Sequence, residues 1–132
     1  MSGDRDYTDF LGITSIRDGA QVWGHLPFDP ALVGNATVKA LHGGTLAALL
    51  GATAVLQAAE SLDLATEPRV VSLTTEFLRP AAYTDTYAEA SFTRLGGRVA
   101  NARVVAWQAE RSEPVAVANV ILTLERRSHE AL

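Results

Sequence analysis

The residues best placed for chemistry stand together in the segment Leu41–Leu62, which reads LHGGTLAALLGATAVLQAAESL. In it, His42, Gly43 and Gly44 precede a run of good helix formers. A helix start offers unpaired backbone N–H groups and a partial positive charge, and glycine lets a ligand approach the backbone closely. The pattern predicts a site for an anion, or for the oxyanion that develops when a carbonyl is attacked. A plain loop-to-helix turn is the alternative for so short a motif.

A third glycine, Gly51, stands about two turns inside the same predicted helix. Glycine in a helix interior costs roughly 1 kcal/mol relative to alanine, so its presence calls for a reason. We expect the helix over about Gly44–Leu62, after a loop of residues 27–40. Its residues are apolar on every side, which indicates a buried helix.

The segments around this helix predict strands. Before it, Thr14–Arg17 and Gln21–Leu26 flank an Asp-Gly pair, which is a strong hairpin signal. After it, Val71–Leu78 alternates with period two, and Pro80 ends that strand. Three further strands are expected at Thr86–Leu95, Val99–Ala109 and Val115–Glu125. Short turns join these strands, so we expect the last four to form a meander.

One central helix without a repeating βαβ rhythm indicates an α+β fold on an antiparallel sheet. Many alanines in the later strands would let that sheet curl closely around the helix. The chain has 132 residues, which predicts a single domain over residues 1–132.

Composition excludes several classes of function. The chain has no cysteine, so a thiolate metal site and a cysteine nucleophile are excluded, and its three scattered histidines predict no metal site. The net charge of −4 argues against nucleic acid or an anionic membrane as partner. The N-terminus lacks an apolar signal segment, and the most apolar stretch, Thr45–Ala59, is too short to span a bilayer. We therefore expect a cytoplasmic protein.

Three elements of the sequence, taken in order, resemble the hotdog-fold acyl-CoA thioesterases of the phenylacetate-pathway (PaaI-like) branch. They are the His-Gly-Gly helix start, the strand VSLTTEFLRPA at Val71–Ala81, and the turn LGGR that leads into the closing strands. Together they extend from about Gly34 to Leu124. The resemblance implies a hotdog fold, in which a curved antiparallel sheet wraps one long helix. It also implies a homodimer or homotetramer with sites at subunit interfaces, a coenzyme A thioester as substrate, and no separate cofactor.

The resemblance also implies roles for the residues of the motif. Gly44 would donate its backbone N–H to the thioester carbonyl, beside Gly43. His42 would shape the turn through hydrogen bonds, with a role as general base as the alternative. An asparagine usually supports the site six residues before the histidine, where this sequence has Ala36. Asn35, one residue earlier, is the candidate, and an Asx turn is its alternative role.

The carboxylate of the family is missing from this sequence. It stands nine residues after the histidine, and that position is Gly51. The residues on the same helix face are all apolar, so no helix side chain replaces the acid from that direction. Glu76 is a candidate displaced base, with an exposed glutamate as the alternative. Arg98, Arg79 and Thr74 are candidates for substrate binding; the arginines would meet coenzyme A phosphates, or else lie at the surface or pair within the sheet.

Two functions follow from this departure. The first is a working acyl-CoA thioesterase, in which water attacks the thioester carbon with help from a base other than residue 51. Loss of a catalytic base commonly costs about 10²–10⁴-fold in rate, so such an enzyme would be slow. The alternative is a non-catalytic acyl-CoA-binding or scaffold protein on the same fold.

Overall fold

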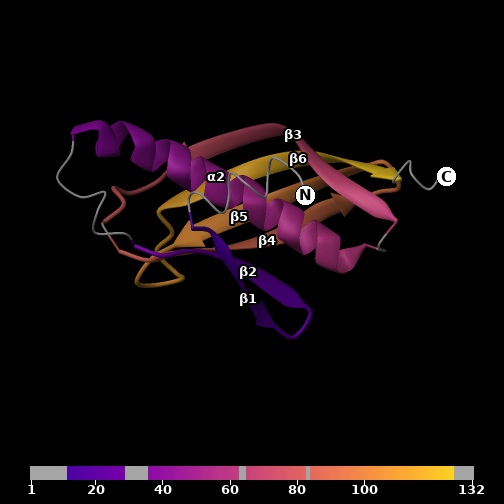
Figure 1. Cartoon of the computed structure of the whole chain (residues 1–132), viewed down its shortest axis with the longest axis horizontal. Coiled ribbons are helices and arrows are strands. Elements are labelled where there is room, and N and C mark those ends of the chain that lie inside the picture. Colours follow the sequence, from indigo (N-terminus) through magenta and orange to yellow (C-terminus); the bar gives the residue numbers. More distant parts are fainter. Residues whose placement is uncertain (1–11, 29–35, 63–64, 83, 127–132) are drawn as a thin grey trace.

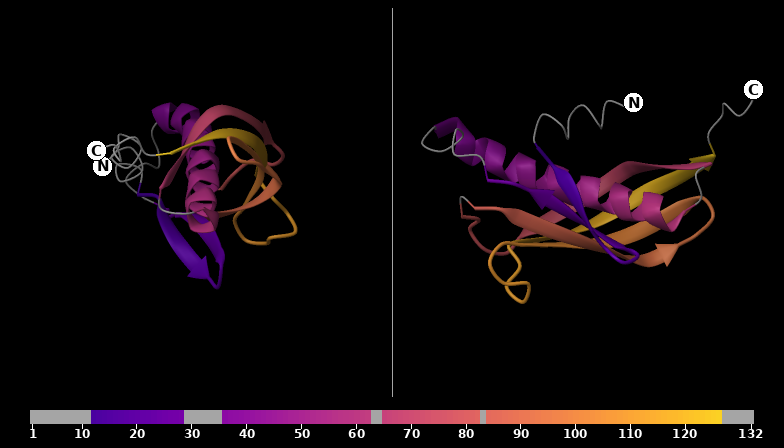
Figure 2. Two further views of the ribbon diagram at one scale, coloured as in Figure 1. Left: turned by 90° about the vertical axis from the view of Figure 1, so that its right-hand side faces the viewer. Right: turned by 60° about the horizontal axis from the view of Figure 1, so that its bottom comes forward.

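The computed structural model describes residues 12–28, 36–62, 65–82 and 84–126, with the backbone alone for residues 36–43. One long helix lies across a six-stranded antiparallel sheet with the strand order β1-β2-β4-β5-β6-β3 (Figure 1). Figure 2 shows the sheet curving around the helix. The elements are β1 (Thr14–Asp18), β2 (Gln21–Leu26), α2 (Ala36–Ser61), β3 (Thr66–Phe77), β4 (Thr86–Leu95), β5 (Val99–Trp107) and β6 (Ala116–Arg126). The predicted α+β architecture is confirmed.

The first hairpin forms where the sequence predicted it. Asp18 pairs with Gln21, and the turn between them places Gly19 at φ 65°. Glycine adopts this left-handed conformation without steric cost, which suits the twist of a two-residue hairpin turn.

Helix α2 begins earlier than the sequence predicted. It starts at Ala36, so part of the expected loop is helical and the His-Gly-Gly motif lies inside the helix. Ala36, Lys39 and Ala40 are good helix formers, and they extend the helix through the glycine pair. Only the first four N–H groups of a helix lack an intrahelical partner. The prediction that this motif begins the helix was therefore wrong, and the N–H of Gly44 occupies an interior position.

Strand β3 begins at Thr66 rather than at the predicted Val71, and it takes a different place in the sheet. Strands β4, β5 and β6 form a meander as expected. Strand β3 pairs with β6, from Thr66↔Arg126 to Phe77↔Ala116. The predicted four-strand meander was wrong in this respect, because alternation identifies a strand but not its neighbour. Strand β3 is consequently an edge of the sheet.

The core lies between α2 and the concave face of the sheet. The sheet contributes some larger side chains, such as Val104, Val120 and Leu122, together with seven alanines: Ala88, Ala90, Ala100, Ala102, Ala106, Ala116 and Ala118. The helix contributes Leu46, Leu49, Leu50, Ala54 and Ala58. These short strand side chains allow the close wrapping that the alanine content predicted. Among the described residues, no helix is both long enough and apolar enough to cross a membrane.

Strand β2 meets the helix most closely at Gly24. A Cβ atom on Gly24 would lie 2.1 Å from Thr53 Oγ1 and 3.0 Å from Leu49 Cδ1. The Thr53 hydroxyl is buried and donates a hydrogen bond of 2.7 Å to the Leu49 carbonyl. One turn later, Gln57 Oε1 accepts the Val22 N–H at 2.9 Å. The polar side chains of the buried helix face are thus satisfied by backbone groups of the helix and of β2.

Replacing Gly24 with alanine tests this close approach. We expect Gly24→Ala to lower the free energy of unfolding, measured in urea, by about 2–3 kcal/mol, near the upper end for overpacked cores. Gly97→Ala is the matched control, because a Cβ atom there would have no described atom within 4 Å. The double variant Gly24→Ala/Thr53→Ala should cost less than the sum of its single changes. Additive costs would contradict the proposed contact.

Candidate functional site

The flank of α2 that faces β3 consists of small residues. Gly44 and Gly51 are seven residues apart, close to two helical turns, so they share one side of the helix with Ala48. A Cβ atom on Gly51 would lie 3.3 Å from Leu73 Cδ1, whereas a Cβ atom on Gly44 would have no described atom within 4 Å. The flank therefore touches β3 at Gly51, and no described atom would contact a side chain at Gly44.

Strand β3 turns Leu73, Thr75 and Phe77 toward this flank. Their pairing partners on β6 are the buried residues Val120, Ala118 and Ala116. Because α2 ends shortly before β3 begins, the two elements run antiparallel (Figure 1). Phe77 therefore lies toward the Gly44 end of the flank, and it is 53% exposed. The helix and the edge strand together form an apolar wall, and Phe77 is exposed at this end of it.

The outer edge of β3 is also apolar. Val70, Val71 and Leu78 are exposed in addition to Phe77. An edge strand presents unpaired backbone N–H and C=O groups, and contiguous exposed apolar residues typically mark an interaction surface. Phe77 thus belongs both to the wall and to the exposed edge of β3.

The structure places Glu76 and Thr74 on the other face of β3. Glu76 pairs with Val117 and Thr74 pairs with Asn119, and both side chains are exposed. Within one chain the structure does not bring Glu76 to Gly51. This placement fits the alternative of a surface glutamate.

The remaining candidates of the motif are placed only in part. Asn35 lies outside the described residues. His42 and Gly43 are helical, but their side-chain surroundings are likewise outside the described part. On the far side of α2, Glu60 makes an ion pair of 2.6 Å with Arg17, and the hydrogen bond from Arg17 lowers the pKa of Glu60. Glu60 is therefore engaged with the first hairpin rather than with the flank.

The two candidate arginines have different surroundings. Arg79 Nε donates a hydrogen bond of 3.1 Å to the Pro114 carbonyl, which fits the alternative of a sheet-pairing arginine. Arg98 is exposed beside Arg94, which the sequence analysis missed. The two arginines border an open hollow of about 400 Å³, lined by Arg94, Gly96, Gly97, Arg98, Val99 and Asn101. Two exposed guanidinium groups at one hollow are suited to bind phosphate.

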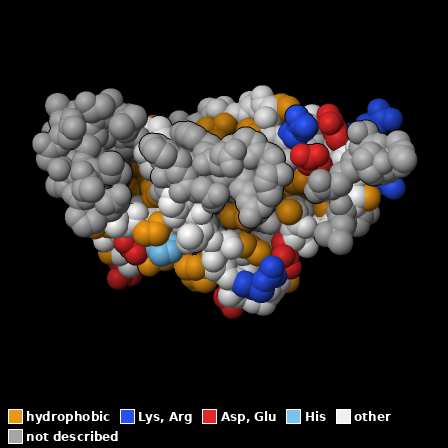
Figure 3. Space-filling view, viewed as in Figure 1, with side chains coloured by type: hydrophobic (Ala, Val, Ile, Leu, Met, Phe, Trp, Pro, Cys, Tyr) orange, Lys and Arg blue, Asp and Glu red, His pale blue; other side chains and the backbone are white. Residues whose placement is uncertain are grey.

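This hollow and Gly44 lie at opposite ends of the molecule along the direction of β3. Across the sheet, Val99 pairs with Thr123 and Thr123 pairs with Arg69, so the hollow is at the end where β3 begins. Gly44 lies toward the end where β3 finishes. In Figure 3, the visible Lys and Arg side chains gather at the tip of the β1–β2 hairpin and at the end where β3 begins.

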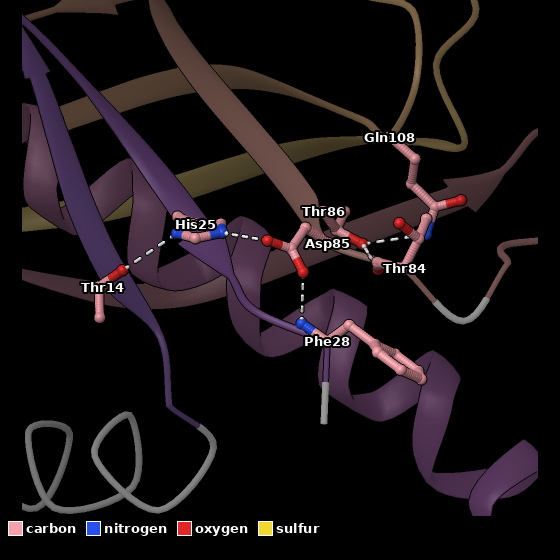
Figure 4. A network of polar contacts seen from close by, with 7 residues as sticks. All are labelled: Thr14, His25, Phe28, Thr84, Asp85, Thr86 and Gln108. Atoms are coloured by element: carbon pink, nitrogen blue, oxygen red, sulfur yellow. Dashed lines mark hydrogen bonds and ion pairs between the residues drawn. The ribbon is translucent and has the colours of Figure 1, made fainter. Parts of the chain in front are cut away.

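A polar network at the end of β2 was not predicted from the sequence (Figure 4). His25 Nε2 lies 3.0 Å from Asp85 Oδ2, and Thr14 Oγ1 lies 3.4 Å from His25 Nδ1. Asp85 Oδ1 accepts the Phe28 N–H at 2.7 Å. The hydrogen bonds from Phe28 and then His25 lower the pKa of Asp85. The network fixes the chain where it leaves the sheet toward α2, and its members are too far apart in sequence for a spacing signal.

A second contact holds the segment that joins β3 to β4. Gln108 Nε2 donates to the Ala82 carbonyl at 2.9 Å and to Thr86 Oγ1 at 3.0 Å, and Gln108 Oε1 accepts the Ala82 N–H at 2.9 Å.

Among the described residues, no group of three or more His, Asp or Glu is arranged to hold a metal ion.

The comparisons with known proteins agree with this architecture. A family model of the acyl-CoA thioesterase N-terminal domain matches residues 32–123. A structure from Chromobacterium violaceum is 28% identical, covers 90% of this chain and 82% of its own, and has a TM-score of 0.71. A Bacillus halodurans protein solved with coenzyme A is 22% identical, with 92% and 79% covered and a TM-score of 0.77.

A phenylacetic acid degradation-related protein from Ralstonia eutropha JMP134 is 21% identical, with 89% of each chain covered and a TM-score of 0.74. Among curated proteins, no sequence matches this chain. The structural likenesses, taken with the helix wrapped by a curved sheet, confirm the hotdog fold.

The lowered pKa of Asp85 gives its network a defined pH dependence. A carboxyl group whose pKa is lower in the folded state contributes stability above its unfolded pKa, about 3.9, and loses that contribution as the pH falls through the folded value. We expect the melting temperature of Asp85→Asn to fall less steeply than that of the wild type below about pH 4. Circular dichroism melts between about pH 2.5 and 7 measure this difference, with Asp18→Asn as the matched control. Equal slopes in the wild type and Asp85→Asn would contradict it.

Proposed function

We propose that this chain, which belongs to the acyl-CoA thioesterase N-terminal domain family, hydrolyses a coenzyme A thioester. Water adds to the thioester carbon, the carbon–sulfur bond breaks, and the products are a carboxylic acid and the coenzyme A thiol. The family match over residues 32–123 carries this proposal. It includes α2, β3, β4, β5 and most of β6, and it leaves out only the first hairpin, β1 and β2. The coenzyme A in the Bacillus halodurans structure supports the ligand. No other cofactor is required, and the absence of cysteine favours a cytoplasmic location.

We place the reaction between two copies of the chain. The exposed apolar edge of β3, including Val71 and Leu78, is suited to pair with the same edge of a second copy. The end of the wall at Gly44 and Phe77 adjoins that edge. A homodimer related by a two-fold axis, alone or within a tetramer, would cover the apolar residues and enclose the wall.

This arrangement also accounts for the separation between Gly44 and Arg98. A two-fold axis across β3 reverses the direction of the second copy. The hollow with Arg98 of the partner subunit would then lie at the same end of the assembly as Gly44. Coenzyme A bound along the flank could place its reactive thioester near Gly44 and its phosphates near the arginines of the partner subunit.

The backbone N–H of Gly44 is the proposed donor to the thioester carbonyl. Inside a helix that begins at Ala36 this N–H is intrahelical, so donation requires the helix to begin at the glycine pair when substrate is bound. Two adjacent glycines, Gly43 and Gly44, favour such an opening, since each weakens a helix by roughly 1 kcal/mol. Asn35 and His42 keep their proposed supporting roles beside this donor.

The second candidate function, an acyl-CoA-binding or scaffold protein, is favoured by one observation. Gly51 offers no base, and the described residues on its flank, including Ala48 and Val55, are apolar. Binding requires only the apolar wall and the phosphate contacts, and neither depends on a carboxylate.

Release of free thiol from a panel of acyl-CoA esters separates these functions. We expect slow turnover by the wild type and a gain in kcat of about 10²-fold in Gly51→Asp, which restores a carboxylate base. The new side chain requires only a small shift of Leu73, whose Cδ1 would lie 3.3 Å from the added Cβ. Gly51→Asn is the matched control of the same shape without the base, and it should show no gain.

The outcomes of that assay are distinct. Wild-type binding without hydrolysis, together with no gain in Gly51→Asp, would establish the binding function instead. A gain in Gly51→Asn equal to that in Gly51→Asp would show that volume rather than a carboxylate limits the reaction.

The phosphate contact is tested with Arg98→Gln. We expect this change to raise KM for an acyl-CoA about tenfold with little change in kcat, since a charge-assisted hydrogen bond contributes roughly that much to affinity. The same acyl group on pantetheine, which lacks the nucleotide phosphates, should be hydrolysed equally well by both proteins. Arg103→Gln, an exposed arginine on β5 outside the hollow, is the matched control. An unchanged KM in Arg98→Gln would remove Arg98 from the site.

A further inference from the structure

The hydroxyl of Thr75 is an unused polar group in the wall between α2 and β3. Thr75 Oγ1 is buried, and it has no hydrogen-bond partner in the described part of the chain. A buried hydroxyl without a partner is destabilising, and most such groups in proteins are paired. By contrast, the buried polar side chains on the β2 side of the helix, Thr53 and Gln57, both have partners. The hydroxyl of Thr75 therefore calls for an acceptor that the described part of the chain does not supply.

The position of Thr75 in the fold points to the bound thioester. Leu73 is level with Gly51, and Thr75 lies two residues further along β3, about 6.7 Å away. On an antiparallel helix with a rise of about 1.5 Å per residue, this corresponds to a shift of four to five residues toward Gly44. Thr75 is thus level with Leu46 and Ala47, between the two glycines of the flank.

The described side chains around Thr75 supply no competing acceptor. On the strand, Leu73 and Phe77 flank it on the same face, and Ala118 is its partner on β6. On the helix, the flank beside it carries Ala48 and Gly51. A carboxylate at residue 51 could have accepted this hydrogen bond, but glycine leaves the hydroxyl free.

We infer that the Thr75 hydroxyl donates a hydrogen bond to the carbonyl oxygen of a bound acyl-CoA. The inference rests on the proposed acyl-CoA ligand, though not on its hydrolysis. The carbonyl oxygen of a thioester is an acceptor only, so the hydroxyl must be the donor. The bond polarises the carbonyl and strengthens as negative charge develops on its oxygen.

Two non-hydrolysable analogues of one acyl-CoA test this contact by calorimetry. In the first, methylene replaces the thioester sulfur, which leaves a ketone; in the second, an S-alkyl thioether, the carbonyl is absent. We expect the wild type to bind the ketone about tenfold more tightly than the thioether. Thr75→Val should reduce this preference to near parity, whereas Thr75→Ser, which keeps the hydroxyl, should retain it.

Controls separate a contact with the ligand from a structural role. Thr123→Val makes the same change on the outer face of β6 and should leave the preference unchanged. Thr75→Val should melt no lower than the wild type, because it removes an unpaired buried hydroxyl. The ¹³C chemical shift of the ketone carbonyl bound to the wild type reports the hydrogen bond without any variant, and it should move downfield. A shift equal to that in water-free solvent would overturn the inference.

The outcomes distinguish this inference from the proposed hydrolysis. A ketone preference that depends on Thr75 in a protein without thioesterase activity would support the contact and overturn the hydrolysis. Hydrolysis combined with equal binding of ketone and thioether, or with a preference kept in Thr75→Val, would overturn the contact alone. Failure to bind either analogue would overturn both the Thr75 contact and the proposed acyl-CoA ligand.

Discussion

The close approach of α2 to the sheet is the constraint on which the rest of the structure depends. Seven alanines at inward positions of β4, β5 and β6, and Gly24 on β2, keep many of the side chains between the two layers short. The sheet must curve to keep this contact along the helix, and the polar groups of Thr53 and Gln57 must find partners within the contact. A core packed in this way has no room for a substrate. This is why the proposed site lies at the flank of the helix and the edge strand β3 rather than in the core.

The sequence predicts most of this fold because the signals for it are local. Period-two alternation and short turns locate strands, and a helix that is apolar on every side must be buried. The neighbour of β3 is not a local property, since alternation reports which side of a strand is buried and not which strand lies beside it. The start of α2 was misplaced for a different reason. Two glycines weaken a helix by roughly 2 kcal/mol together, a cost that favourable neighbours such as Ala36 and Ala40 can offset.

The residues of the candidate site also differ in whether a local sequence signal can identify them. The His-Gly-Gly motif and the missing acid at Gly51 can be found from one segment of sequence. The unpaired hydroxyl of Thr75 cannot, because its lack of a partner depends on what α2 and β6 bring to it. The contact between His25 and Asp85 likewise joins distant segments without any spacing pattern. Arg94 becomes a candidate for phosphate binding only because the β4–β5 hairpin places it beside Arg98.

The balance between donors and bases decides whether a site without a carboxylate can still work. Loss of a general base costs about 10²–10⁴-fold, or roughly 3–5 kcal/mol of activation free energy. One donor to a developing oxyanion contributes about 10²–10³-fold, and two such donors would contribute more than the base takes away. Gly44 on α2 and Thr75 on β3 would supply those donors. A water molecule attacking a carbonyl polarised in this way needs less help from a base, since the negative charge is already stabilised. On this arithmetic, glycine at residue 51 would slow the proposed hydrolysis without abolishing it, which favours a slow thioesterase over an inert binding protein.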